Sequence, residues 1–249
     1  MRSHHLRAAL AGSGSGSSVL INQTGLSVYY DFGNTSSWAG NSNSTAITDL
    51  SGNSNNATLQ GTTYAKDTAD GGSITFGGHS NTNTEGYGRF TLGSALTFTN
   101  TQDFTLFVGY KLPASYSGSW FMFAGNNDGD NFIGRYSASF FRIQDGSNNN
   151  IDISGSTGGG RGMQSHYSGI KVFYAVKDNQ TGYFYEEGLL SNGGTTNTSF
   201  SDITLSSNQY DNSTFYPAYQ MFFWGIYSRA LSASEIASNY SVHEDRLGI

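Results

Sequence analysis

The sequence predicts an all-β protein in which two large antiparallel sheets form a sandwich, with one short helix near the C-terminus. Roughly a dozen segments show the alternation of apolar and polar residues that is typical of half-buried strands. Long polar loops separate these segments. The two prolines, Pro113 and Pro217, stand where they bound strands rather than interrupt them. At 249 residues, such a sandwich is expected to form one domain.

Residues 1–18 are predicted to stand apart from the domain, which covers residues 19–249. Residues 1–11 form a short basic arm, and residues 12–18 have the glycine and serine composition of a flexible linker. The apolar run 8–11 is too short for the core of a signal peptide, so we expect no standard secretion. The arm is either a leader without a role or a docking peptide. We favour docking, because a tether is useful only with something at both ends.

Three segments show the clearest strand patterns. Residues 26–32, 104–110 and 172–176 each place apolar side chains at every second position. After the last of these, residues 178–182 carry turn-forming residues at both ends and predict a hairpin. Shorter strand candidates are residues 73–76, 120–123, 140–143, 151–153 and 183–185.

The C-terminal region combines an aromatic strand with a helix start. Residues 219–227 are almost continuously apolar, which predicts a strand buried on both faces, with Trp224 in the core. Ser232 and Glu235 follow with the spacing of a capping box, in which each side chain satisfies a backbone N–H at the start of a helix. A short helix is therefore expected to close the sandwich.

Several of these segments, taken in order, carry a resemblance to a known fold family. Residues 25–34 and 48–59, then 71–76 and 103–108, and finally 219–236 resemble laminin-G-like, concanavalin A-type jelly-roll domains of the kind found in phage virion and bacterial surface proteins. The resemblance covers most of residues 25–240. It implies a jelly-roll sandwich, and function must be argued separately because one fold hosts many functions.

The composition indicates a neutral polar surface. Charged residues make up only 12% of the chain, about half the usual share, and the net charge is −6. With no run of lysine or arginine, nucleic acid is not an expected partner. No apolar run is long enough to span a membrane. The absence of cysteine excludes disulfides and thiolate metal sites.

The pattern of carboxylates predicts a protein that is not an enzyme. Glycoside hydrolysis needs two carboxyl groups that flank the bond. Glu186 and Glu187 are adjacent and would point to opposite faces of a strand, while Asp128 and Asp130 lie in a loop. No Gly-x-Ser-x-Gly motif occurs. A pair assembled from distant strands would leave no such pattern and stays an alternative.

Two loops rich in oxygen ligands make calcium the metal to consider. Asn126, Asp128 and Asp130 occupy alternate positions of one loop, and Asp49 and Asn53 belong to the other. Ca²⁺ binds six to eight oxygen atoms from carboxylates, amides, carbonyls and water. The alternative for each loop is a turn in which Asp and Asn side chains bond to their own backbone. Both interpretations stay open.

Aromatic residues in polar loops are the candidates for carbohydrate binding. A sugar ring needs a flat aromatic face, and its hydroxyls need amide or carboxylate partners. Each of these aromatics could instead serve local packing. The candidates are Trp38, Tyr87, Tyr116, Trp120 and Tyr210.

Together these observations predict a non-enzymatic surface protein of a tailed-phage virion, made in the host cytoplasm. Residues 1–18 would anchor it to a capsid, tail or fibre protein, and its loops would bind host-surface carbohydrate. We expect a homo-oligomer on the particle. The alternatives are a purely structural decoration or cement protein without glycan binding, and a polysaccharide-degrading enzyme.

Overall fold

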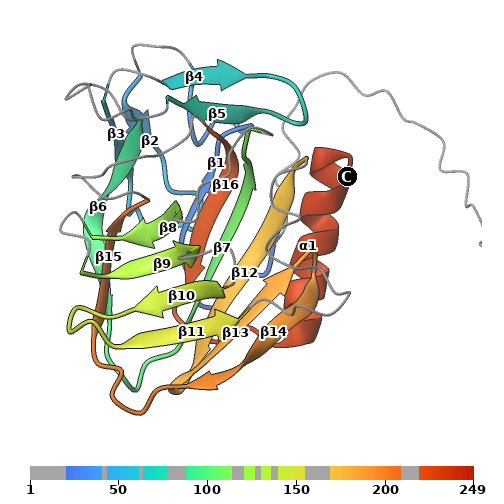
Figure 1. The fold of residues 1–249 in the computed structure, drawn as a ribbon. Coiled ribbons are helices and arrows are strands. Elements are labelled where there is room, and N and C mark those ends of the chain that lie inside the picture. The colour runs from blue at the N-terminus through green and yellow to red at the C-terminus, as the bar shows by residue number, and fades with distance from the viewer. Residues whose placement is uncertain are drawn as a thin grey trace, which may run out of the picture.

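Two antiparallel sheets of eight strands each face one another, and a helix lies against the outer face of one of them (Figure 1). This arrangement confirms the predicted all-β sandwich. No helix in the described part of the chain is long and apolar enough to cross a membrane. The computed structural model describes residues 21–40, 44–61, 64–77, 88–113, 121–126, 130–135, 140–154, 169–208 and 219–249.

The first sheet is organised around its long last strand, β16. One edge of β16 pairs with β7, while the other edge pairs with β5 and then with β1. The order is β14-β13-β12-β7-β16-β5-β4, with β1 beside β16. Its strands are β1 (Leu26–Asp31), β4 (Tyr64–Asp67), β5 (Ser73–Phe76), β7 (Phe104–Lys111), β12 (Lys171–Asp178), β13 (Thr181–Glu186), β14 (Leu189–Thr196) and β16 (Tyr219–Tyr227).

The second sheet has the order β11-β10-β9-β8-β15-β6-β3-β2. The consecutive strands β8 to β11 form a meander, whereas β15 comes from a distant part of the sequence and lies between β8 and β6. Its strands are β2 (Ala46–Ile47), β3 (Ala57–Gln60), β6 (Arg89–Phe98), β8 (Phe121–Gly125), β9 (Phe132–Arg135), β10 (Phe140–Gln144), β11 (Asn150–Ser154) and β15 (Ile203–Ser207).

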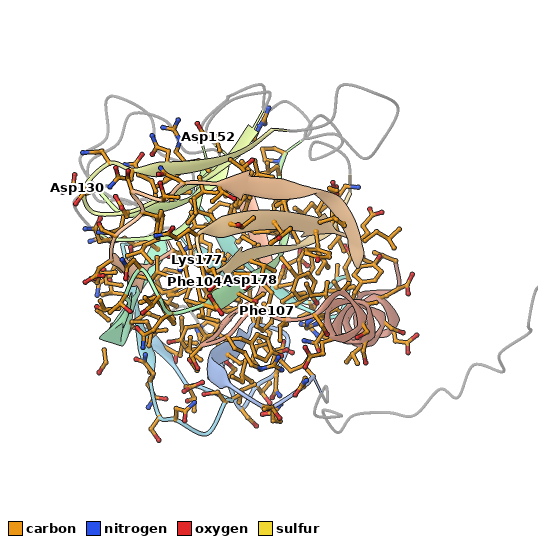
Figure 2. The ribbon with its side chains drawn as sticks, turned by 90° about the horizontal axis from the view of Figure 1, so that it is seen from below. Phe104, Phe107, Asp130, Asp152, Lys177 and Asp178 are labelled. Carbon is orange, nitrogen blue, oxygen red and sulfur yellow. The ribbon has the colours of Figure 1, made fainter. Side chains whose placement is uncertain are left out.

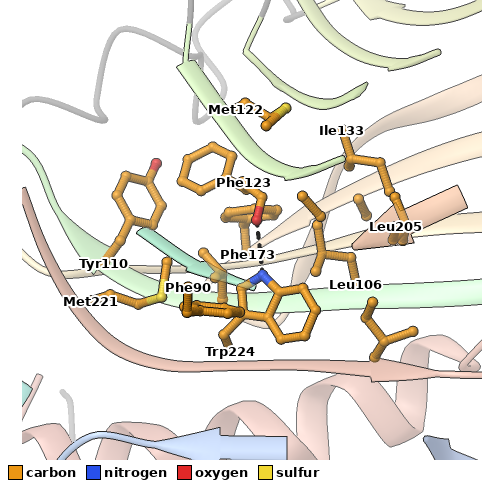
Figure 3. Close-up of a cluster of buried hydrophobic side chains, with 14 of the residues drawn as sticks. Phe90, Leu106, Tyr110, Met122, Phe123, Ile133, Phe173, Leu205, Met221 and Trp224 are labelled. Atoms are coloured by element: carbon orange, nitrogen blue, oxygen red, sulfur yellow. Dashed lines mark hydrogen bonds between the residues drawn. The ribbon is translucent and has the colours of Figure 1, made fainter. Parts of the chain in front are cut away.

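The core between the sheets is dominated by aromatic rings. Trp224 is fully buried there and stacks on Tyr30, with ring centroids 5.8 Å apart and an interplanar angle of 13°. Its indole Nε1–H donates a 2.8 Å hydrogen bond to the backbone oxygen of Phe123 on the opposite sheet (Figure 3). The bond satisfies the polar atom of a buried tryptophan. The expected core role of Trp224 is confirmed.

A second apolar layer lies on the outer face of the first sheet, beneath helix α1 (Ala233–Leu247). Phe104 belongs to the inter-sheet core, whereas Phe107 of the same strand lies on the side of the helix (Figure 2). The helix has 15 residues, so the prediction of a short helix was wrong in length. It continues because buried residues recur at helical spacing: Ile236, Asn239, His243 and Leu247.

The start of α1 confirms the predicted capping box. The Ser232 hydroxyl accepts the backbone N–H of Glu235 at 3.4 Å, and the Glu235 carboxylate accepts the backbone N–H of Ser232 at 2.9 Å. Arg229 also donates to both carboxylate oxygens of Glu235, at 2.7 and 3.0 Å. The Arg229 hydrogen bond, followed by that of the Ser232 backbone, lowers the pKa of Glu235 to about 2.

The far end of α1 is attached to β1 by a buried ion pair. A guanidinium nitrogen of Arg246 lies 2.7 Å from the Asp31 carboxylate, and both side chains are almost fully enclosed. The same nitrogen donates to the backbone oxygens of Gly71 and Gly72. Burial raises the pKa of Asp31, and the Arg246 charge only partly offsets this effect. Both ends of the helix are therefore held by charged hydrogen bonds.

Candidate functional site

The candidate site is an open hollow of about 620 Å³ beside the start of β1, which we call the polar hollow. Four segments that are far apart in the sequence form its wall: residues 23–27, residues 51–55, the middle of β6 and the residue that follows β16. The lining side chains are amides and hydroxyls, with two leucines between them. The lining residues are Gln23, Gly25, Leu26, Ser27, Ser51, Asn53, Ser54, Asn55, Ser94, Leu96 and Ser228.

Asp49 lies behind the wall and organises it. One of its carboxylate oxygens accepts the backbone N–H groups of Tyr29 and Ser51, at 3.0 and 2.9 Å. The other accepts the Ser51 hydroxyl at 2.8 Å and the Asn55 backbone N–H at 3.0 Å. These bonds fold the loop around a buried carboxylate, as in the turn that was the alternative to calcium. The loop is therefore preorganised by its own side chain.

Two asparagine amides attach this loop to the sheets on either side. The Asn53 amide nitrogen donates to the backbone oxygens of Leu26 and Ser27, at 2.7 and 3.1 Å. Asn55 exchanges two hydrogen bonds of 2.9 Å with the backbone of Ser94 on β6. The side-chain oxygen of Asn53 accepts no hydrogen bond from the described residues, so it is open to a ligand hydroxyl.

The polar hollow is electrically neutral, because none of its lining residues carries a charge. Arg229 lies beside Gly25 at the rim, but its guanidinium is bound by both oxygens of Glu235. Amides and hydroxyls act as both donors and acceptors, which suits the hydroxyl groups of a sugar. Leu96, which is partly exposed, supplies apolar surface for its C–H groups, whereas Leu26 is almost fully buried. This chemistry fits an uncharged polar ligand.

The structure places one of the five aromatic candidates, and it places that residue in the core. Trp38 is only 1% exposed, packs edge-to-face on Phe32, and donates its indole N–H to the Ser44 backbone oxygen at 3.1 Å. Its ring has no face for a sugar in this structure, because a short turn after β1 folds it inward. Tyr87, Tyr116, Trp120 and Tyr210 lie outside the described residues.

The two loops considered for calcium differ in what the structure shows of them. In the first, Asn126 accepts the backbone N–H of Asn131 at 3.2 Å and Asp130 is exposed, while Asp128 lies outside the described residues. In the second, the hydrogen bonds of Asp49 and Asn53 described above all join the loop to itself or to β1. Within the described ranges, no three His, Cys, Asp or Glu side chains gather to hold a metal ion.

Removing the Asp49 carboxylate is expected to lower the free energy of unfolding by about 2–3 kcal/mol, because an Asp49→Ala variant leaves the buried N–H of Tyr29 without its acceptor. Urea denaturation measures the change. The control is Asp130→Ala at an exposed position, whose free energy of unfolding is expected to stay within about 0.5 kcal/mol of the parent value. Added calcium is expected to leave the melting temperature unchanged. A calcium-dependent rise that Asp49→Ala abolishes would contradict this assignment of the loop.

The adjacent glutamates that the enzyme hypothesis considered form ion pairs with one lysine. The ammonium of Lys171 lies 2.9 Å from Glu187 and 3.8 Å from Glu186. The expectation that they point to opposite faces does not hold, because β13 ends at Glu186 and Glu187 takes a positive φ of 50° in the following turn. Both carboxylates therefore lie within ion-pair distance of the same ammonium group.

A fold of this kind also occurs in solved binding domains of a mosquitocidal protein and of botulinum neurotoxins. The binding domain of Paraclostridial Mosquitocidal Protein 1 is 17% identical, with a TM-score of 0.57 over 88% of this chain and 52% of that one. The botulinum neurotoxin serotype G binding domain is 12% identical, with a TM-score of 0.60 over 88% and 51%.

A third similar structure comes from botulinum neurotoxin type C, a toxin that depends on two ganglioside molecules to enter cells. It is 14% identical, with a TM-score of 0.59 over 89% of this chain and 52% of that one. At this level of identity the likeness shows the fold, and this chain spans about half the length of the domains it matches. No family model and no curated protein sequence match it.

Proposed function

We propose that this chain is a non-enzymatic carbohydrate-binding module and that the polar hollow holds an uncharged glycan. The observation that carries the proposal is the lining of the hollow: amides and hydroxyls on a preorganised loop, two leucines and no charged group. The similar structures support a binding role, because they are binding domains, and one was solved with SialylT bound. The absence of a lining cation favours neutral sugars over sialylated ones for this chain.

We further infer that the module belongs to a phage virion and meets host-surface glycans there. The support is the basic arm and glycine-serine linker of residues 1–18, the low-charge composition and the resemblance to sandwich domains of virion proteins. A capsid, tail or fibre partner would bind the arm, which lies outside the described residues. Assembly of several copies on the particle is part of the same proposal.

Filling the polar hollow is expected to weaken glycan binding. Ser94 and Ala95 are exposed neighbours on β6, but only Ser94 lines the hollow. A Ser94→Tyr variant should lose at least about tenfold in affinity on a glycan array, which corresponds to about 1.4 kcal/mol. Ala95→Tyr is the matched control and should bind as the parent does.

The same array tests the glycan class. We expect neutral glycans to bind at millimolar concentration or below, with no gain from sialylation and little dependence on salt. If Ser94→Tyr and Ala95→Tyr bind equally, the site is elsewhere. If the parent binds no glycan at all, the carbohydrate proposal itself fails.

A structural role as a decoration or cement protein is the second candidate. The observation that favours it is a pair of exposed leucines, Leu189 and Leu190, each 56% exposed at the start of edge strand β14. Adjacent exposed apolar side chains on the last strand of the described sheet are suited to contact between proteins. This role would be supported if the unmodified chain bound no glycan on the array but was still incorporated into virus particles.

A further inference from the structure

His243 occupies the middle of the interface between α1 and the first sheet. Its imidazole is fully buried and stacks on the ring of Phe223, with centroids 3.7 Å apart and an interplanar angle of 14°. It also lies 5.9 Å from the ring of Phe107. The residue therefore serves the same packing role as the apolar residues of the helix, Ile236 and Leu247.

Neither ring nitrogen of His243 has a hydrogen-bond partner among the described residues. Buried polar atoms are nearly always paired, so an imidazole with two unpaired nitrogens is unusual. An apolar residue could fill this position without that cost. The histidine adds one property that an apolar residue lacks, which is the ability to take up a proton near neutral pH.

The groups that surround His243 do not favour a second positive charge. Arg246 follows one turn later on α1, and its guanidinium carbon lies 5.8 Å from the centroid of the same Phe223 ring. On β1, the Asp31 carboxylate is already paired with Arg246 and accepts the Tyr29 hydroxyl. Burial, and next the charge of Arg246, hold the pKa of His243 well below its usual value.

The side chains that the remaining strands contribute to the apolar layer beneath the helix are neutral, and the charged residues of β7 and β12 stand at or next to the strand ends. On β12, the buried Tyr174 hydroxyl has no partner among the described residues. On β16, the Tyr227 hydroxyl is occupied, since it donates to the Asn22 backbone oxygen and accepts the Asn239 amide. On β7, the contact is the ring of Phe107. No carboxylate in these strands is free to pair with a protonated His243.

We propose that protonation of His243 in mildly acidic solution releases α1 from the sheet and exposes the aromatic face beneath it. Release can be local, because the described core between the sheets contains no residue of α1. The closed form binds fewer protons than the open form, so opening becomes more favourable as pH falls below the ordinary histidine pKa of about 6.5. The exposed face includes Phe107, Tyr174, Phe223 and Tyr227.

A pair of engineered cysteines distinguishes this release from general unfolding, because the chain has no cysteine of its own. Ile236→Cys places a thiol under α1, and Leu106→Cys places one between the sheets; both positions are fully buried. A pyridyl disulfide reagent, calibrated with a free thiol at each pH, reports their exposure. The labelling rate, divided by that of the free thiol, gives the equilibrium constant for opening at each cysteine. From pH 7.5 to pH 5 this constant should rise roughly 30-fold at Ile236→Cys and little at Leu106→Cys.

Replacing the histidine tests the cause. In the Ile236→Cys background, His243→Phe and His243→Leu should each remove the pH dependence, because neither side chain can be protonated. If both variants fold and keep the 30-fold rise, another group is responsible and the proposal is wrong. Equal labelling of Leu106→Cys and Ile236→Cys at pH 5 would show global unfolding and would also overturn it.

Discussion

Replacing Arg246 with methionine is expected to lower the free energy of unfolding by about 3–5 kcal/mol, because the change leaves the buried Asp31 carboxylate without its charged partner. Methionine retains most of the side-chain volume, so the loss reports the charge rather than a cavity. The backbone oxygens of Gly71 and Gly72 lose a donor in the same step. Urea denaturation followed by circular dichroism measures the difference.

Two further variants separate the burial of the charge from the loss of an ordinary ion pair. The pair between Lys111 and Asp70 is 3.6 Å long and both side chains are at least 40% exposed, so Lys111→Met should cost no more than about 1 kcal/mol. Combining Arg246→Met with Asp31→Asn should recover part of the loss, because the buried charge is then gone. Equal costs for Arg246→Met and Lys111→Met would show that burial does not matter here.

Strand positions could be predicted from the sequence because alternation is a local property. Phe104 and Leu106 project into the inter-sheet core as the pattern indicated, and the hairpin at residues 178–182 joins β12 to β13. Alternation does not reveal whether the opposite face is also covered. Tyr29 and Asp31 alternate with the core residues of β1, and both are buried, because the outer sheet face carries α1.

The length of α1 was missed because its buried stripe is weakly hydrophobic. Two of its four buried residues, Asn239 and His243, are polar and look like surface residues in a sequence. Asn239 is buried because it bonds to the Tyr227 hydroxyl and to the Asn22 backbone. These partners are separated from it by 12 and 217 residues, and no local pattern reveals them.

The polar hollow shows the same limit for a candidate site. The loop around Asp49 and Asn53 was singled out as rich in oxygen ligands, and it does form one wall. The rest of the lining includes Ser94 and Ser228, two serines that the sequence does not single out as ligands. Only the pairing of β1 with β16 and of β3 with β6 brings them to the loop. A search for loop aromatics therefore did not find this site.

Truncating Trp224 to alanine is expected to have the other large effect, about 3–5 kcal/mol in the free energy of unfolding. The ring is fully buried between the sheets, where it stacks on Tyr30 and meets Phe90 edge-to-face at 5.2 Å. Its removal leaves a cavity that two stiff sheets cannot close. Thermal and urea unfolding both measure the loss.

Trp224→Phe isolates the hydrogen bond within that effect. It keeps an aromatic ring but removes the indole N–H, so the Phe123 backbone oxygen loses its partner across the core, at about 1–3 kcal/mol. Trp38→Phe is the matched control, because the Ser44 oxygen it leaves belongs to a partly exposed residue that water can reach. We therefore expect Trp38→Phe to cost less. Equal losses would mean that the cross-sheet bond adds nothing beyond ring packing.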